Sequence, residues 1–234
     1  MTTKTAMGLA PVGRETVQDR VYSELRRALI GGLFEPGQVL TIRTLADALM
    51  TSTMPVREAL GRLITEQALE ALPNRTVRVP PITLDRLDDL LRARILIEGE
   101  AIRLAVPRMT AAELIAAEEI MREWQELRLG GNPQTVDREV ALNHAFHFVL
   151  YNACGSAILI PMIESLWLQS GPCTRAAIFA FSDAGRHDAD SHHIAILNAL
   201  KARDAAAAQA ALCADISRPF AVLRDKLGRK EAAE

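Results

Sequence analysis

Four polar side chains in the second half of the chain have the types and the spacing of a divalent-metal site. Asn143 and His147 are four residues apart, so on a helix they would share one face. His193 precedes Asp204 by 11 residues, and Asp215 follows it by 11. If Asp204 caps the last helix of an antiparallel hairpin, His193 and Asp215 lie at one height, roughly 16 Å from the turn. Two imidazoles, one carboxylate and one amide converging inside a helical bundle suit zinc, nickel or a similar ion.

The same histidines have a second interpretation. Inside a helical bundle, a histidine is more often a hydrogen-bonded core residue than a metal ligand, so both alternatives stay open. His144 and His192 are each adjacent to a member of the set, and we expect them to point elsewhere.

A second stretch, residues 51–63, has the pattern of a helix that contacts DNA. Its apolar residues recur at i, i+3, i+4 and i+7, which predicts one buried stripe formed by Val56, Ala59, Leu60 and Leu63. Ser52 would cap the start, and Pro55 would lie in the first turn, where no amide partner is lost. The opposite face carries Thr53, Met54, Arg57 and Glu58. A short helix with a polar, arginine-bearing leading edge suits the major groove of DNA.

Three helices and a hairpin are predicted to position these residues in the first 80. The helices cover about 14–30, 41–50 and 52–64, and Gly31-Gly32 ends the first. Residues 69–72 and 77–79 flank a polar tip, which predicts a two-stranded hairpin. This order of elements is a winged helix-turn-helix, here assigned to residues 14–80 after a flexible tail at 1–13.

The remainder, residues 81–234, is predicted to be an all-helical antiparallel bundle, so the fold class is mainly α. Pro80-Pro81 marks the linker. Apolar periodicity and helix breakers predict helices at 84–106, 110–129, 135–153, 156–181, 188–202 and 205–226.

Composition limits the function classes. The net charge of the 234 residues is −2, but residues 1–80 carry +2 and the remainder −4, which fits DNA contact by the front part alone. No apolar run reaches the ~18 residues of a membrane helix, and no signal peptide is evident. The three cysteines have no metal spacing and are interpreted as reduced core thiols of a cytoplasmic protein.

The front part resembles a known family. The residues that match are Tyr22, Leu25, Ile30, Gly32, Pro36-Gly37, Leu40, Leu45-Ala46 and Ser52-x-x-Pro55-Val56-Arg57-Glu58-Ala59-Leu60-x-x-Leu63. Over about residues 17–79 they resemble the N-terminal domain of GntR-type bacterial transcription regulators. Thr53, Gln67 and Thr76 depart from the arginine and two glycines usual in that family.

The DNA contacts expected from this resemblance and from the exposed helix face are Arg43, Ser52, Thr53, Met54 and Arg57, with Asn74, Arg75 and Thr76 on the wing. One such module offers too little contact for useful specificity. We therefore expect a homodimer on an inverted-repeat operator in double-stranded DNA.

The second part resembles the FCD ligand-binding domain of the FadR branch of that family, through Arg94-x-x-x-Glu98, Asn143-x-x-Phe146-His147, His193-x-x-Ile196-Leu197, Asp204 and Asp215. Metal-binding members use one aspartate and three histidines; here Asn143 stands for the aspartate and Asp215 for the last histidine. The resemblance implies a small organic acid effector, bound through a metal or directly by Arg94, Asn143, His147 and His193. It also implies a ligand-responsive regulator of a metabolic operon, expected to be a repressor.

Two alternatives come from other function classes. A metal-dependent hydrolase or lyase could use His147 and His193 as bases, but the sequence has no separate nucleophile–base pair and no glycine-rich phosphate loop. A protein-interaction adaptor would have no salt-dependent affinity for DNA.

Overall fold

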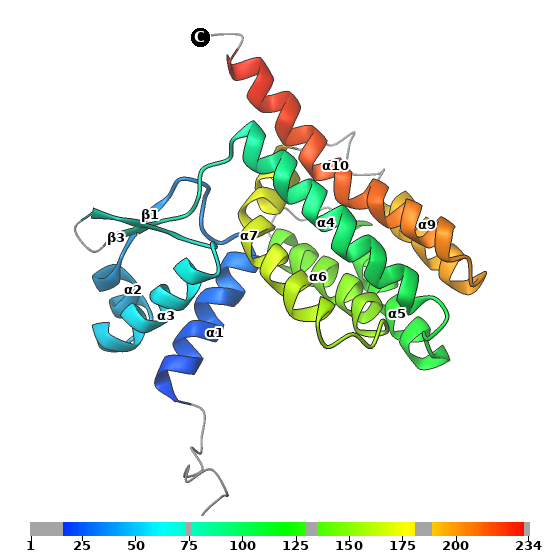
Figure 1. Ribbon diagram of the computed structural model, residues 1–234, viewed down its shortest axis with the longest axis horizontal. Helices are drawn as coiled ribbons and strands as arrows, with labels where there is room; N and C mark the ends of the chain where they lie inside the picture. The colour runs from blue at the N-terminus through cyan, green and yellow to red at the C-terminus, as the bar shows by residue number, and fades with distance from the viewer. Residues whose placement is uncertain (1–15, 74–75, 130–134, 181–188, 232–234) are drawn as a thin grey trace, which may run out of the picture.

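The computed structural model describes residues 16–73, 76–129, 135–180 and 189–231. Within these ranges the chain is mainly helical, as predicted, with a small sheet near the N-terminal side (Figure 1). The predicted tail at residues 1–13 lies outside the described residues. No helix in the described ranges is both long enough and apolar enough to cross a membrane.

The front part contains three helices: α1 (Val17–Ile30), α2 (Ile42–Ala48) and α3 (Thr53–Thr65). Thr16 and Asp19 form a reciprocal capping box at the start of α1. The predicted stripe of α3 is buried and packs in one core with α1 and the sheet. Helix α3 therefore presents its other face to solvent.

The sheet has three strands where the sequence predicted two. They are β1 (Val39–Thr41), β2 (Glu70–Leu72) and β3 (Thr76–Arg78), in the order β1-β3-β2 with both pairs antiparallel. The prediction missed β1 because three residues with a single buried one, Leu40, are too short to show alternation. Its partner, Val77, is far away in the sequence.

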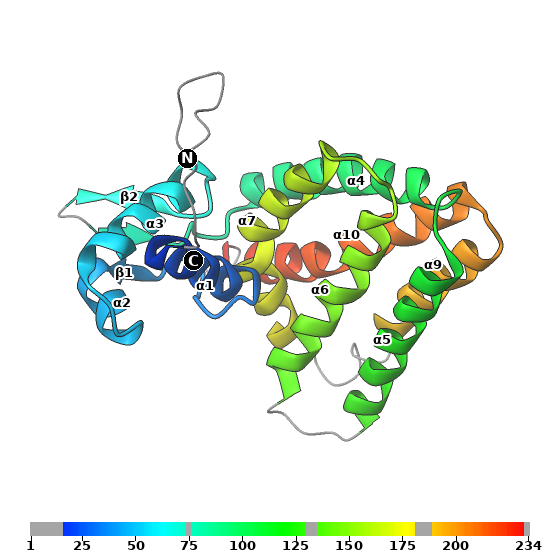
Figure 2. The ribbon, with the colours of Figure 1, turned by 90° about the horizontal axis from the view of Figure 1, so that it is seen from below.

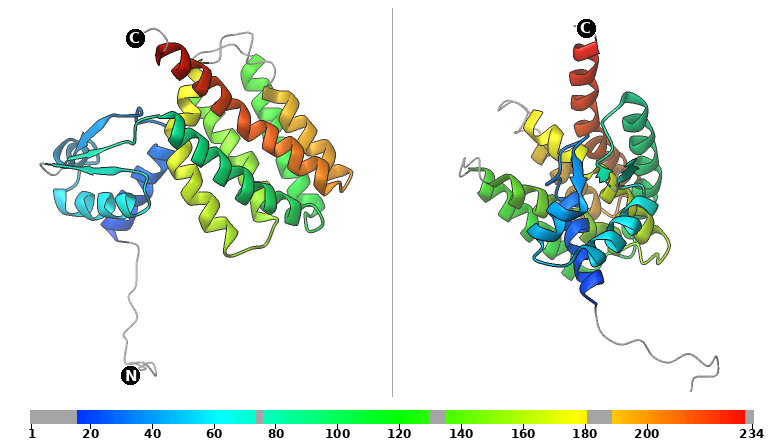
Figure 3. Two further views of the ribbon diagram at one scale, coloured as in Figure 1. Left: turned by 45° about the horizontal axis from the view of Figure 1, so that its top comes forward. Right: turned by 90° about the vertical axis from the view of Figure 1, so that its left-hand side faces the viewer.

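The second part is a layered helical bundle. It comprises α4 (Leu84–Ala105), α5 (Ala111–Leu129), α6 (Val136–Asn152), α7 (Leu159–Ala180), α9 (Ala189–Lys201) and α10 (Ala205–Glu231). Helices α4 and α10 run side by side, and α9 packs on α10 (Figure 3). Cys154 and Cys173 are buried and Cys213 is half-buried, all as free thiols.

Helices α9 and α10 form the predicted antiparallel hairpin. Arg203 turns the chain with a φ of 58°, and the Asp204 carboxylate accepts a hydrogen bond of 3.0 Å from the amide of Ala207. Asp204 is therefore the cap from which the positions of His193 and Asp215 were predicted.

Helix α7 belongs to the bundle but also completes the front core. Figure 2 shows it between α1 and the other helices of the bundle. Its Leu168 is fully buried in the core of the front part, beside residues of α1 and α3. A Cβ on Gly171 would lie 2.2 Å from the carbonyl oxygen of Leu29, so only glycine permits this approach of α7 to α1.

Candidate metal centre and DNA-contact surface

The structure brings three of the four predicted metal ligands together. His147 on α6, His193 on α9 and Asp215 on α10 offer donor atoms that all lie within 4.8 Å of one another. Both histidine side chains are 2% exposed, and Asp215 is 15% exposed. The equal spacing about Asp204 explains how α9 and α10 bring their two donors to one height.

The protonation state of His147 suits a metal. His147 Nε2 lies 3.1 Å from Asp215 Oδ2. Burial lowers the pKa of His147, which favours the neutral imidazole. A histidine coordinates a metal through its neutral imidazole, so burial already favours the form of His147 that binds a cation.

His193 supplies the test of whether these residues fit a metal. Its Nε2 lies 3.4 Å from Asp215 Oδ1, outside hydrogen-bond geometry, so neither ring nitrogen is hydrogen-bonded within the described part of the chain. Leaving a buried polar group unpaired costs about 1–3 kcal/mol. A cation bound by His193, His147 and Asp215 would remove this penalty at one ring nitrogen, so the donor set fits a zinc- or nickel-type ion.

A second unpaired donor lies beside His193. The indole of Trp124 on α5 is 4.7 Å from the His193 ring, centroid to centroid. Its Nε1 is buried and has no hydrogen-bond partner in the ranges that the structure describes. An indole N–H only donates, so a ligand could satisfy Trp124 Nε1 only through an acceptor atom.

Asn143, the fourth predicted ligand, lies one turn before His147 on α6 and is half-buried. Its amide makes no hydrogen bond to another described residue. Nothing in these ranges therefore competes with an incoming ligand for the Asn143 side chain.

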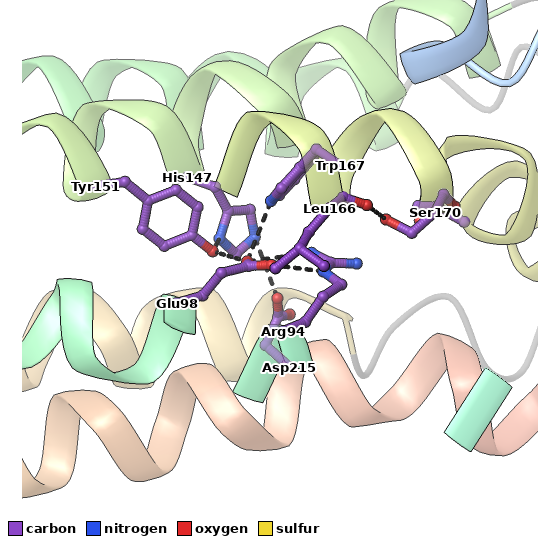
Figure 4. Close-up of polar contacts among 9 residues, drawn as sticks. Arg94, Glu98, His147, Tyr151, Leu166, Trp167, Ser170 and Asp215 are labelled. Atoms are coloured by element: carbon purple, nitrogen blue, oxygen red, sulfur yellow. Dashed lines mark hydrogen bonds and ion pairs between the residues drawn. The ribbon is translucent and has the colours of Figure 1, made fainter. Parts of the chain in front are cut away.

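Arg94 on α4, which the sequence predicts as a counter-charge for the effector, forms a buried ion pair with Glu98. Its Nε donates to Glu98 Oε1 at 2.6 Å and its Nη2 to Glu98 Oε2 at 3.2 Å (Figure 4). Both side chains are at most 5% exposed. A buried guanidinium bound at two points has little charge left for an acid ligand.

Glu98 is the centre of a buried network that sequence reasoning did not assign. Besides Arg94, it accepts hydrogen bonds from the Tyr151 hydroxyl and, at 3.1 Å, from Trp167 Nε1. The i, i+4 spacings from Arg94 to Glu98 and from His147 to Tyr151 were available as a signal. No sequence pattern connects Trp167 or Trp124 to the site, because they come from other helices.

The predicted DNA contacts on α2 and α3 lie at the surface. Arg43, Ser52, Thr53, Met54 and Arg57 are all exposed. Ser52 takes the N-cap position of α3, but its side chain makes no capping hydrogen bond. Arg57 has no ion-pair partner among the described residues. These groups are available to phosphates or base edges.

The wing is described only in part. Thr76 begins β3, and its hydroxyl donates to the carbonyl of Pro73 at 3.0 Å. Asn74 and Arg75 lie outside the described residues.

Comparisons with known proteins match both parts of the chain. Residues 17–79 match the family model for bacterial regulatory proteins of the gntR family, and residues 89–218 match the FCD domain. The HTH-type transcriptional regulator McbR of Escherichia coli K12 is 30% identical over 90% of this chain and 94% of its own. The HTH-type transcriptional repressor GlaR of the same organism is 24% identical over 88% of this chain and 95% of its own.

The solved structure of E. coli McbR/YncC has a TM-score of 0.84, at 28% identity, over 92% of this chain and all of that one. These relatives are named as transcription regulators, which sets aside the hydrolase or lyase alternative. The chain therefore belongs to the GntR family of bacterial transcription regulators, with an FCD second domain as in the FadR-like subfamily.

Proposed function

We propose that this regulator is a repressor whose affinity for operator DNA is changed by a small organic acid bound in the helical bundle. The observation that carries the proposal is the placement of two adjacent residues on α7. Trp167 donates to Glu98 in the bundle network, whereas Leu168 is buried in the core of the front part. A movement at the network therefore shifts the support of the DNA-binding helices, which is a coupling between two sites.

Two further contacts strengthen this connection. Arg26 on α1 forms an ion pair of 3.0 Å with Glu164 on α7. Arg175 on α7 donates to the carbonyl of Gly31 at 3.3 Å, directly after α1 ends. Helix α1 in turn packs on α3, so α7 reaches the recognition helix through a single intervening helix.

We place the proposed effector site at the ligand cluster. His147, His193 and Asp215 would hold zinc or nickel. Bound there, the metal would supply positive charge and open coordination positions for a carboxylate. Trp124 and Asn143 would donate to the remaining acceptor atoms of the acid. Because Arg94 is bound to Glu98, we remove it from the proposed effector contacts.

For DNA recognition, we place α3 in the major groove with Arg57 and Thr53 at the bases and phosphates, and the wing with Thr76 at the neighbouring groove. The small contact area of one winged module supports a homodimer on an inverted repeat. The repressor assignment is supported by the relative GlaR, which is named a repressor.

DNA binding is tested on the DNA upstream of the protein's own gene. The fluorescence anisotropy of that fragment should rise with protein and fall steeply with salt. If the protein binds this fragment no more tightly than unrelated DNA at every salt concentration, the fragment does not contain an operator for it.

The effector site is tested with a panel of mono- and dicarboxylates added to zinc-loaded protein on the same fragment. The double variant His147→Ala with His193→Ala should lose zinc uptake and the acid response, yet keep acid-free DNA binding. If wild-type protein purified without chelators takes up neither zinc nor nickel, the proposed metal site is refuted. If the double variant still responds to the acid, the proposed effector site is refuted.

A further inference from the structure

The Glu98 carboxylate determines where the Tyr151 proton points. Glu98 is fully buried, and Arg94 binds both of its oxygens. A carboxylate held this way only accepts hydrogen bonds. The close contact between the Tyr151 hydroxyl and Glu98 Oε2 therefore requires the phenol to donate to Glu98.

The reverse arrangement is unfavourable. If the Tyr151 proton pointed at His147, two oxygens carrying lone pairs would face each other in a buried contact without a proton between them.

With its proton on Glu98, the Tyr151 oxygen accepts from the ring of His147, whose Nδ1 is 3.2 Å away. In the neutral imidazole, the tautomer that makes this hydrogen bond carries its proton on Nδ1. The other nitrogen, Nε2, carries a lone pair and lies 3.1 Å from Asp215 Oδ2, which is also an acceptor. Two acceptors that face each other repel, and a cation between them would turn this repulsion into attraction.

We propose that Glu98 and Tyr151 are positioning residues for the metal centre, and that their hydrogen bonds hold His147 in the Nδ1–H tautomer with the Nε2 lone pair toward the cation. The inference deepens the proposed function, because it rests on the metal site and assigns the groups that orient one ligand. Outer contacts of this kind commonly change metal affinity by about 10- to 100-fold.

The hydrogen bonds that connect Glu98 through Tyr151 to His147 form a relay, and the variant that tests it is Tyr151→Phe, which keeps the buried ring and removes only the hydroxyl. Tyr22→Phe is the matched control, since the Tyr22 hydroxyl donates to Glu66 at 2.6 Å in the front part. Zinc titration at pH 8 should show an affinity about tenfold weaker for Tyr151→Phe and unchanged for Tyr22→Phe.

A second measurement reads the tautomer directly. Nitrogen-15 NMR of the imidazoles in the metal-free wild type at pH 8 should show His147 protonated on Nδ1, and Tyr151→Phe should lose this preference. An Nε2–H ring in the wild type would overturn the proposal, as would unchanged zinc affinity in a folded Tyr151→Phe protein. A wild type that has the Nδ1–H ring but takes no zinc would refute the metal and leave the relay standing. The wild-type spectrum decides the relay even if the variant does not fold.

Discussion

The contact between α1 and α7 makes the substitution Gly171→Ala a sharp test of the structure. The added Cβ would lie 2.2 Å from the carbonyl oxygen of Leu29, 2.7 Å from that of Ile30 and 2.8 Å from the Ile30 Cα. All three are backbone atoms, which have no rotamer through which to move away. The two helices must therefore separate, and the burial of Leu168 in the front core is reduced with them.

The magnitude follows from two opposing effects. Alanine in place of a helical glycine stabilises by about 1 kcal/mol through backbone entropy. Forcing a methyl group into a packed contact costs typically about 1–3 kcal/mol and more where backbone must shift. Because three backbone atoms are involved here, we expect the cost to dominate and to leave a net loss of about 2 kcal/mol. For a chain of this size, that lowers Tm by roughly 4–8 °C.

The assay is thermal unfolding of Gly171→Ala beside Gly228→Ala. Gly228 lies on α10, and a Cβ there would meet nothing within 4 Å. The control variant therefore gains only the higher helix propensity of alanine over glycine, and its Tm should rise above that of the wild type. A Gly171→Ala protein that melts at or above the wild-type temperature would refute the close approach of α7 to α1.

The remaining predictions address DNA binding, pH and the division of the chain. Arg57→Ala should cost roughly 1–3 kcal/mol of specific operator binding. The control is Arg122→Ala on α5, an exposed position where the substitution should cause no loss of affinity. Equal operator affinity of the two variants in anisotropy titrations would contradict the placement of α3 in the major groove. Burial lowers the pKa of His144 to about 4. In the unfolded chain the His144 imidazole has an ordinary pKa, so it binds a proton at a higher pH than in the folded protein. The free energy of unfolding should therefore fall as the pH decreases from about 6.5 to 4. If the urea midpoint of His144→Phe falls as steeply over this range as that of the wild type, the prediction is contradicted. A fragment of residues 1–80 lacks Leu168, so its urea midpoint should lie well below that of the front part in the intact chain; equal midpoints would show that α7 adds nothing to that core.

The sequence by itself determined the class of fold and most elements. Apolar periodicity placed the recognition helix, because burial of one stripe is a local requirement that every turn of the helix repeats. The spacing about Asp204 placed His193 and Asp215 at one height, because a helical hairpin has a fixed rise per residue. Strand β1 was not predicted, because its pairing with β3, and not a pattern in its own residues, makes it a strand.

Only the tertiary structure decided which polar groups are still available to a ligand. Arg94 and His193 were both among the predicted effector contacts. The structure shows Arg94 bound to Glu98 and His193 without a hydrogen bond within the described ranges. Likewise, no pattern along α7 distinguished Trp167, which faces the bundle network, from Leu168, which completes the other core. Hydrogen-bond partners and core membership depend on which helices pack together. Packing brings residues far apart in the sequence into contact, so local spacing does not encode it.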